Sequence, residues 1–225
     1  MQFSVICWEG CGVSIHNLIV LGQNITLVYE SLDLRAFESS RLKGLVHAQP
    51  PPMLMDTPEM IVAVFPPEPT VIQVGDQRIR ITMQQQSDDV GKVPIWEIAI
   101  KCHQLVAGSA LVAYGFNYDI GAELTGGNLH ETMIDLFVSN PQTMESVLGG
   151  HLLYAVPRLK FQRRQTRYDL VLEPASEKRL TAHLNVHFDM APVALPPSDQ
   201  LAVSFREEFR YLVSMLPRLL EGSKQ

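Results

Sequence analysis

The residues best suited to acid–base chemistry alternate along one short stretch near the end of the chain. His183, Asn185, His187 and Asp189 occupy every second position, so in a β-strand they share one face. His183 and His187 are then roughly 13 Å apart, too far to share one ion. His187 and Asp189 are close enough to act as a base and its orienting carboxylate. An enzyme would therefore have its catalytic residues here, although the same regular alternation is typical of the solvent face of a half-buried strand.

A second set of reactive side chains lies near the N-terminus. Cys7, Cys11 and His16 are of the types that bind zinc, but the two cysteines are one residue further apart than in the common knuckle. A closed zinc site also needs four ligands, and no fourth is evident from the spacing. The alternative is that Cys7 packs as a small apolar residue and Cys11 lies in a turn. We therefore predict no metal and no cofactor.

The strongest local charge pattern is a run of five cations within ten positions of a net-acidic chain. A two-stranded ribbon rich in arginine can contact phosphate, an acidic protein surface or a carboxylate ligand. Charge on an edge hairpin also prevents aggregation. Phe161 and Tyr168 are the aromatic residues interleaved with the cations, which is little for stacking nucleic-acid bases. The hairpin is thus a candidate partner-binding surface, formed by Arg158, Lys160, Arg163, Arg164 and Arg167.

Sequence motifs for the common catalytic and nucleotide-binding sites are absent. The chain contains no G-x-S-x-G, P-loop, G-x-G-x-x-G, H-E-x-x-H or EF-hand pattern. We therefore expect a non-catalytic interaction or assembly module that binds a protein partner or self-associates through a sheet edge or the basic hairpin. No small-molecule ligand is identifiable from the sequence. Two alternatives stay open, namely an enzyme using His187 and Asp189 and a nucleic-acid-contacting accessory protein using the hairpin over 158–167.

The composition is that of a globular protein. Apolar residues make up 46% and charged residues 19% of the 225 residues, and the net charge is −6. This balance excludes a disordered chain and argues against general binding to nucleic acid or to anionic membranes. Three cysteines fit a reducing compartment, and the first residues lack the pattern of a secretory signal. A cytoplasmic location is the resulting expectation.

The order of the expected strands and helices predicts an α+β fold, in which antiparallel β-meanders are each followed by helices. The first part, 1–48, reads as strands over 13–21 and 25–29 with a turn at 22–24, then a helix over 34–46 capped by Asp33. A proline-rich linker is expected over 49–59, because consecutive prolines donate no ladder hydrogen bonds. The main domain is expected over 60–225. It begins with a hairpin whose turn is Gly75-Asp76.

Further along, alternation and capping signals continue the pattern. A strand is predicted over 96–103, because apolar and more polar residues alternate there, and another over 112–118. Asn128 and Asn140 are expected to open helices ending at 137 and before Gly149. Three further strands are predicted over 153–161, 168–172 and 180–188, because apolar residues there fall on one strand face. Ser198 is expected to cap a final helix that Pro217 kinks or ends.

A shift of 70 positions aligns the two halves of this main domain. Asp119 falls on Asp189, each after an aromatic residue at the predicted end of a strand, and Asn128 falls on Ser198. One explanation is duplication of a meander-plus-helix unit, with half-units 70–149 and 150–220. The other is two independent uses of a common arrangement, which is favoured because a true repeat should share more than one identical residue.

Overall fold

The computed structural model describes residues 14–46, 52–66, 70–84, 90, 93–189 and 193–221. They form one nine-stranded antiparallel sheet with five α-helices, which confirms the predicted α+β class. The strand order is β2-β3-β4-β5-β1-β6-β9-β8-β7. The strands are β1 Ser14–Tyr29, β2 Met53–Asp56, β3 Met60–Phe65, β4 Thr70–Gly75, β5 Arg78–Met83, β6 Leu111–Thr125, β7 Arg158–Arg163, β8 Thr166–Ser176 and β9 Arg179–Phe188. The helices are α1 Ser39–Leu42, α2 Ile95–Leu105, α3 Leu129–Phe137, α4 Pro141–Leu148 and α5 Ser198–Glu221, with a 3₁₀ turn η1 Leu34–Phe37 before α1.

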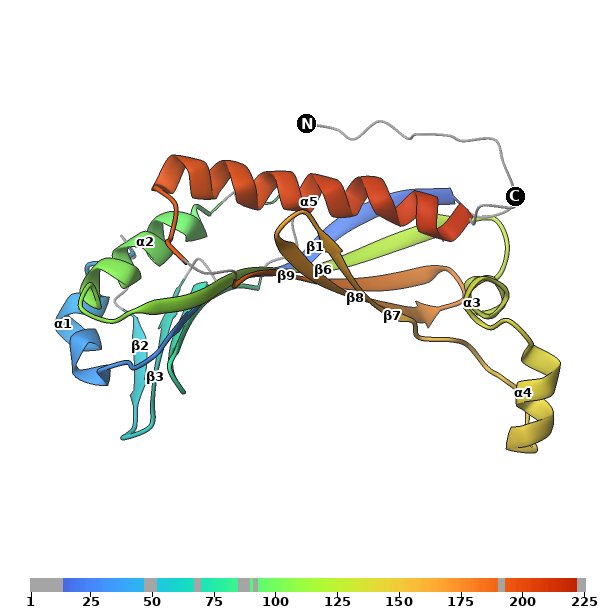
Figure 1. The fold of residues 1–225 in the computed structure, drawn as a ribbon, viewed down its shortest axis with the longest axis horizontal. Helices are drawn as coiled ribbons and strands as arrows, with labels where there is room; N and C mark the ends of the chain where they lie inside the picture. Colours follow the sequence, from blue (N-terminus) through green and yellow to red (C-terminus); the bar gives the residue numbers. More distant parts are fainter. Residues whose placement is uncertain are drawn as a thin grey trace.

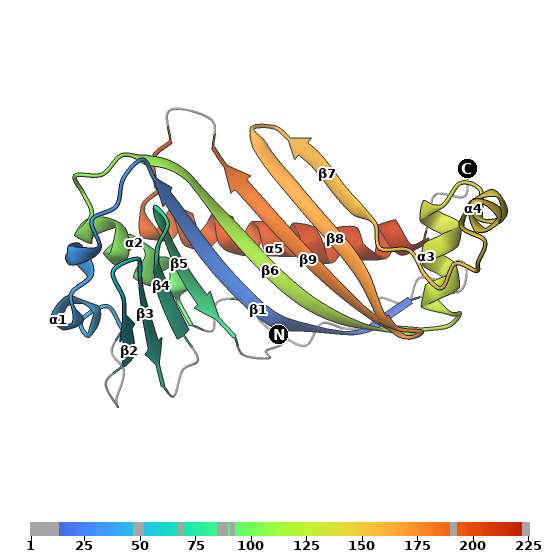
Figure 2. The same ribbon diagram turned by 90° about the horizontal axis from the view of Figure 1, so that it is seen from below.

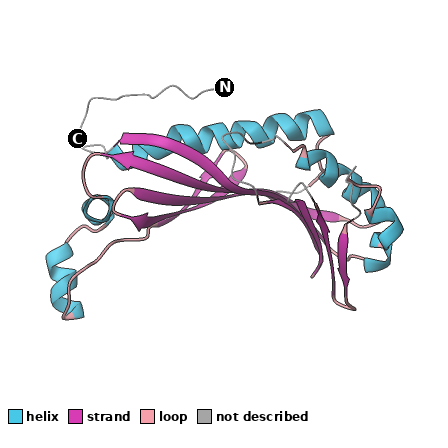
Figure 3. Ribbon diagram, turned by 180° about the vertical axis from the view of Figure 1, so that it is seen from behind, coloured by secondary structure: helices cyan, strands magenta, loops and turns pink. Residues whose placement is uncertain are grey.

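The sheet is bent into an arch (Figure 1). Helix α5 runs along its convex side together with α2, while β2 and β3 lie at one end of the arch and α4 at the other. The same two-layer arrangement is seen from behind in Figure 3. Viewed from below, the strands lie in front of α5 (Figure 2), so no helix of the described residues covers the centre of the concave face of the sheet. We call this surface the open face.

The core lies between the sheet and α5. The predicted apolar stripe of the last helix is confirmed, because Leu201, Phe205, Phe209, Leu212 and Leu216 are all buried. Such spacing places one side of a helix against the sheet. The buried Tyr118 of β6 donates a 2.6 Å hydrogen bond to the Phe205 carbonyl, which satisfies its hydroxyl inside the core. Pro217 lies within α5, and the helix continues beyond it.

The strand predicted over 96–103 is wrong, because this segment is helix α2. Ile95, Ile98, Ala99 and Cys102 are buried, and their spacing of three and four is that of one helical face. Apolar residues also fall at alternate positions, so the segment fits both periods. Packing of the helical face against β1, β5 and α5 overrides the β-propensity of its isoleucines.

Two predicted turns also differ. The turn at 22–24 does not form, since β1 pairs with β6 continuously and only a register shift between Val20 and Gly22 marks the place. The first hairpin is present, but its turn residues with positive φ are Asp76 (50°) and Gln77 (59°). These values are typical of the turns whose twist matches antiparallel strands. Gly75 instead ends β4, where a Cβ would meet the Glu59 carbonyl at 2.8 Å.

The predicted helix starts are confirmed by their capping bonds. The Asn128 side chain accepts from the His130 amide and the Asn140 side chain from the Thr143 amide. Gly149 ends α4 with φ of +65°, the left-handed conformation that favours glycine. Asp33 likewise caps η1, but the helix predicted over 34–46 is divided into η1 and the short α1. The polar pair of serines at 39 and 40 begins this second piece.

The described structure does not show the duplication that the two halves suggest. Asp119 lies inside β6 and pairs across to β9, whereas Asp189 follows the end of β9. The strand predicted from Leu153 begins only at Arg158. In place of two meander-plus-helix units, the structure has a single sheet. Its strand β1 comes from the expected segment 1–48, and its edge strand β2 from the expected linker 49–59.

Candidate functional site

The centre of the open face is a band of polar side chains that runs across neighbouring strands. In the register of β6 and β9, Asn117 lies opposite Asn185 and Asp119 opposite His183. Asn117 continues the band into β1 by donating a 2.6 Å hydrogen bond to Asn24. The predicted polar face of β9 is therefore confirmed. It is one row of a larger network that spans several strands.

Within this band, Asp119 and His183 form the site's only histidine–carboxylate hydrogen bond among the described residues. The His183 Nδ1 bonds the Asp119 Oδ1, and the Asn185 amide lies 3.1 Å from the His183 Nε2. The hydrogen bond that His183 makes to the Asp119 carboxylate raises the pKa of this histidine above its usual 6.5. Both side chains remain partly exposed, at 39% for His183 and 43% for Asp119. The pair is thus a proton-binding group on an open sheet surface.

The pairing expected from sequence, His187 with Asp189, is not seen in the described structure. Asp189 forms an ion pair with Arg167 of β8. His187 lies opposite Gly115 and Arg167, and burial together with the Arg167 charge lowers its pKa. A base and its orienting carboxylate are therefore not assembled at this end of β9. The enzyme hypothesis built on these two residues gains no geometric support.

The predicted basic hairpin exists as β7 and β8, but its cations do not form one patch. Arg158 makes a two-pronged bond to Asp169, at 2.8 and 2.5 Å, and lowers the pKa of that carboxyl. Lys160 is 4.0 Å from the same carboxylate. The remaining cations separate: Arg167 pairs with Asp189, Arg163 lies 4.4 Å from the centre of the Tyr211 ring on the α5 side, and Arg164 occupies the turn with φ of 55°. Local pairing reduces the positive potential that phosphate binding requires.

The cysteine-based metal hypothesis cannot be placed on the structure as a whole. Cys7 and Cys11 lie outside the described residues, and His16 is exposed in β1. Within the described ranges, no group of three potential ligands is close enough to hold a metal ion. Cys102 is fully buried in α2, and burial raises the pKa of its thiol to about 12. It therefore packs as an apolar residue and not as a nucleophile.

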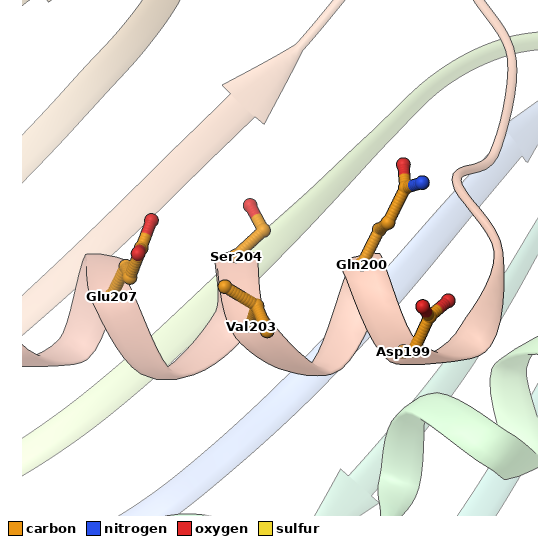
Figure 4. Close-up of a pocket in the computed structure, with 5 residues that line it drawn as sticks. All are labelled: Asp199, Gln200, Val203, Ser204 and Glu207. Carbon is orange, nitrogen blue, oxygen red and sulfur yellow. The ribbon is translucent and has the colours of Figure 1, made fainter.

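A shallow depression of about 300 Å³ lies on the outer side of α5 (Figure 4). Its lining residues all belong to the first turns of this one helix: Asp199, Gln200, Val203, Ser204 and Glu207. A binding pocket normally encloses its ligand between several elements. This depression is lined by α5 alone, so no second element faces it. It is also remote from the polar band, which lies on the other face of the sheet.

The most unusual apolar surface lies at one end of the arch, in a segment that we call the α4 arm, residues 141–156. No side chain of α4 is buried. Met144, Val147 and Leu148 are 46%, 81% and 65% exposed, although their spacing forms an apolar stripe on the helix. The following segment adds three more exposed apolar side chains: Leu153, Tyr154 and Val156. Soluble proteins rarely leave so many neighbouring apolar side chains in water unless the surface binds a partner.

A second apolar surface lies at the opposite end of the arch, on the open face of β2, β3 and β4. We call it the sheet-end patch: Met53, Met55, Val62, Val64 and Val71. The pairs Met53–Val64 and Met55–Val62 are cross-strand neighbours, so the side chains are contiguous. Met53 and Met55 are 64% and 57% exposed. Figure 1 shows strands β2 and β3, which carry most of this patch, at one end of the molecule and helix α4 at the other.

No protein-family model matches the chain, and no curated protein matches its sequence. None of the helices in the described part is long and apolar enough to cross a membrane. Sequence reasoning missed both apolar surfaces. The signal for the arm was present in the sequence, as an apolar stripe between the helix cap Asn140 and the helix stop Gly149. The sequence does not reveal whether such a stripe is covered within the chain, and among the described residues no side chain of α4 is buried.

Proposed function

We propose that this chain is a non-catalytic assembly module that binds a protein partner through the α4 arm. The observation that carries the proposal is the exposure of the arm's apolar stripe, with Val147 at 81%. The Asp119–His183 pair lies partly exposed on an open sheet surface, at 43% and 39%, which supports a binding role over a catalytic one. The contact surface is thus helical, and it differs from the basic hairpin favoured by charge alone.

The energetics of α4 support this role. A helix of eight residues is too short to be stable in water without tertiary packing. Its caps at Asn140 and Gly149 supply about 1 kcal/mol each at most. An amphipathic helix with a solvent-facing apolar stripe is typical of segments that dock into a partner's apolar surface. We therefore expect the arm to be covered when the protein acts.

Site-specific photo-crosslinking in the native cell tests the proposal. A photoreactive phenylalanine analogue at position 147 should give a discrete adduct, and the same analogue at the matched exposed position Val203 (53% exposed) should not. Adding Leu148→Lys should abolish the adduct, because a charge in the stripe opposes burial. Absence of a discrete adduct at 147, or equal adducts at both positions, contradicts the assembly role of the arm.

The same crosslinking experiment also tests whether the basic hairpin is the contact surface. Arg163 lies against Tyr211 and Arg164 lies in the turn, so replacing both by Glu removes charge without opening the core. If the arm is the contact, Arg163→Glu with Arg164→Glu leaves the adduct at 147 unchanged. Loss of the adduct in this variant places the contact at the hairpin instead.

A further inference from the structure

We infer that the partner of the α4 arm is a second copy of this chain, whose sheet-end patch receives the arm head to tail. This inference rests on the proposed function, since it names the partner of the same surface. The two surfaces lie at opposite ends of the arch (Figure 1). One chain therefore cannot join them to each other, but two chains can.

The shapes of the two surfaces fit one another. The arm offers a helix with an apolar stripe, and the patch offers the apolar face of an antiparallel sheet whose β2, β3 and β4 have no described helix on that side. A helix stripe packed on a sheet face is the arrangement by which two-layer domains bury apolar surface. This chain already uses it on the convex side, where Phe205 and its neighbours on α5 cover the sheet.

The areas are large enough for a weak specific contact. The six exposed apolar residues of the arm present roughly 600 Å² to water, and the patch, in which Met53 and Met55 are more than half exposed and the valines are partly buried, presents roughly 300–400 Å². One head-to-tail contact would bury on the order of 1,000 Å² in total, near the lower limit of specific protein interfaces.

The charges that face the two surfaces are opposite. The arm contains Glu145 and no lysine or arginine, and helix α3 before it adds Glu131 and Asp135. On the open face, the charged side chains of strands β2 to β5 are Arg78 and Arg80, and Arg80 pairs across with Gln73 of β4, beside the patch. Asp56 lies on the other face of the sheet, opposite the buried Ile61, and Glu59 and Asp76 lie between strands. A contact between an arm and a patch places opposite charges next to each other. A contact between two arms, or between two patches, places like charges next to each other. Charge therefore favours the head-to-tail contact over a two-fold dimer.

The experiment uses two variants of the full-length protein that alter exposed side chains. The arm variant is Val147→Lys with Leu148→Lys, and the patch variant is Met53→Lys with Met55→Lys. All four positions are more than half exposed, so folding should be preserved, which circular dichroism checks. Val203→Lys is the matched control. Sedimentation velocity at increasing concentration measures assembly.

Wild-type protein and the Val203→Lys control should form species larger than a monomer. Each double variant should raise the Kd of association by about 100-fold or more, because the substituted residues lie at the centre of the contact. An equimolar mixture of the two variants should form a heterodimer and nothing larger, since one intact arm then meets one intact patch. Arg78→Glu with Arg80→Glu should weaken wild-type assembly by about tenfold or more.

Three results would each overturn the inference. These are a monomeric wild type at about 100 μM, unimpaired assembly of either double variant, and a mixture that does not form a heterodimer. A monomeric wild type whose position 147 still crosslinks to a different protein overturns self-association while the assembly role of the arm stands. Failure of both experiments removes the arm as a binding surface altogether.

Discussion

Replacing Asp119 by Asn should remove a contribution to folding stability that is present in mild acid and absent in alkali. The Asp119 hydrogen bond raises the pKa of His183 in the folded protein above its usual 6.5. A histidine whose folded-state pKa is raised stabilises the fold below the unfolded value, and this stabilisation is lost as the pH rises through the folded value. The contribution is therefore present below pH 6.5 and declines as the pH rises through the higher pKa of the folded protein.

The structure limits the size of this effect. His183 and Asp119 are 39% and 43% exposed, so water and salt screen the pair and the range for exposed ion pairs applies. We expect Asp119→Asn to lower the free energy of unfolding by about 0.5–1 kcal/mol at pH 5.5 and by almost nothing at pH 9. Adding 1 M salt should reduce the cost at pH 5.5, because the Debye length then falls to about 3 Å.

Urea unfolding at the two pH values measures the effect, and a cycle with His183→Gln isolates the pair from other roles of the carboxylate. Proton NMR of the imidazole supplies an independent readout. The midpoint of His183 should lie above 6.5 in the wild type and fall in Asp119→Asn. His187, whose pKa burial lowers, should titrate below 6.5 in both proteins. An equal cost at both pH values, or a His183 midpoint that does not move, refutes this account.

Two further substitutions test the packing of the sheet, each against a matched control in urea unfolding. Phe205→Ala should cost about 3–5 kcal/mol, because the ring is fully buried among aromatic side chains; Val203→Ala, half exposed on the same helix, should cost less than about 0.5 kcal/mol. Gly115→Ala should cost about 1–3 kcal/mol, since its Cβ would lie 2.6 Å from the Val186 carbonyl. Gly108→Ala should be near neutral within about 0.5 kcal/mol, having no atom within 4 Å of a Cβ. Equal costs within either pair contradict the packing described.

Much of the fold follows from local signals in the sequence. The caps at Asn128 and Asn140 and the stripe of α5 depend on residues within one helix, so the sequence alone predicts them. The segment around Trp96 does not behave in this way, because its apolar residues satisfy a period of two and a period of 3.6 alike. Only its contacts with β1, β5 and α5 select the helix.

The candidate site shows the same division between local and long-range information. Alternation along β9 predicts that His183 and His187 share a face, and they do. Which of them meets a carboxylate depends on the register with β6, which places Asp119 opposite His183. The sequence separation of 64 residues carries no periodic signal. Asp189 is nearer than Asp119 to these histidines along the chain, but its carboxylate forms an ion pair with Arg167 on the neighbouring strand.

The division of the open face into a polar centre and an apolar end has a consequence for how an arm would dock. An arm shifted from the sheet-end patch toward the centre would cover the Asn24–Asn117 bond and the Asp119–His183 pair with apolar side chains. Partly exposed polar groups would then lose water without gaining partners, at a cost of about 1–3 kcal/mol for each group. In the proposed head-to-tail contact, the register would thus be set both by the polar band, which disfavours apolar cover, and by the apolar patch, which binds the arm. Replacing band residues such as His183 by apolar ones should therefore loosen the register while leaving the affinity of the patch itself intact.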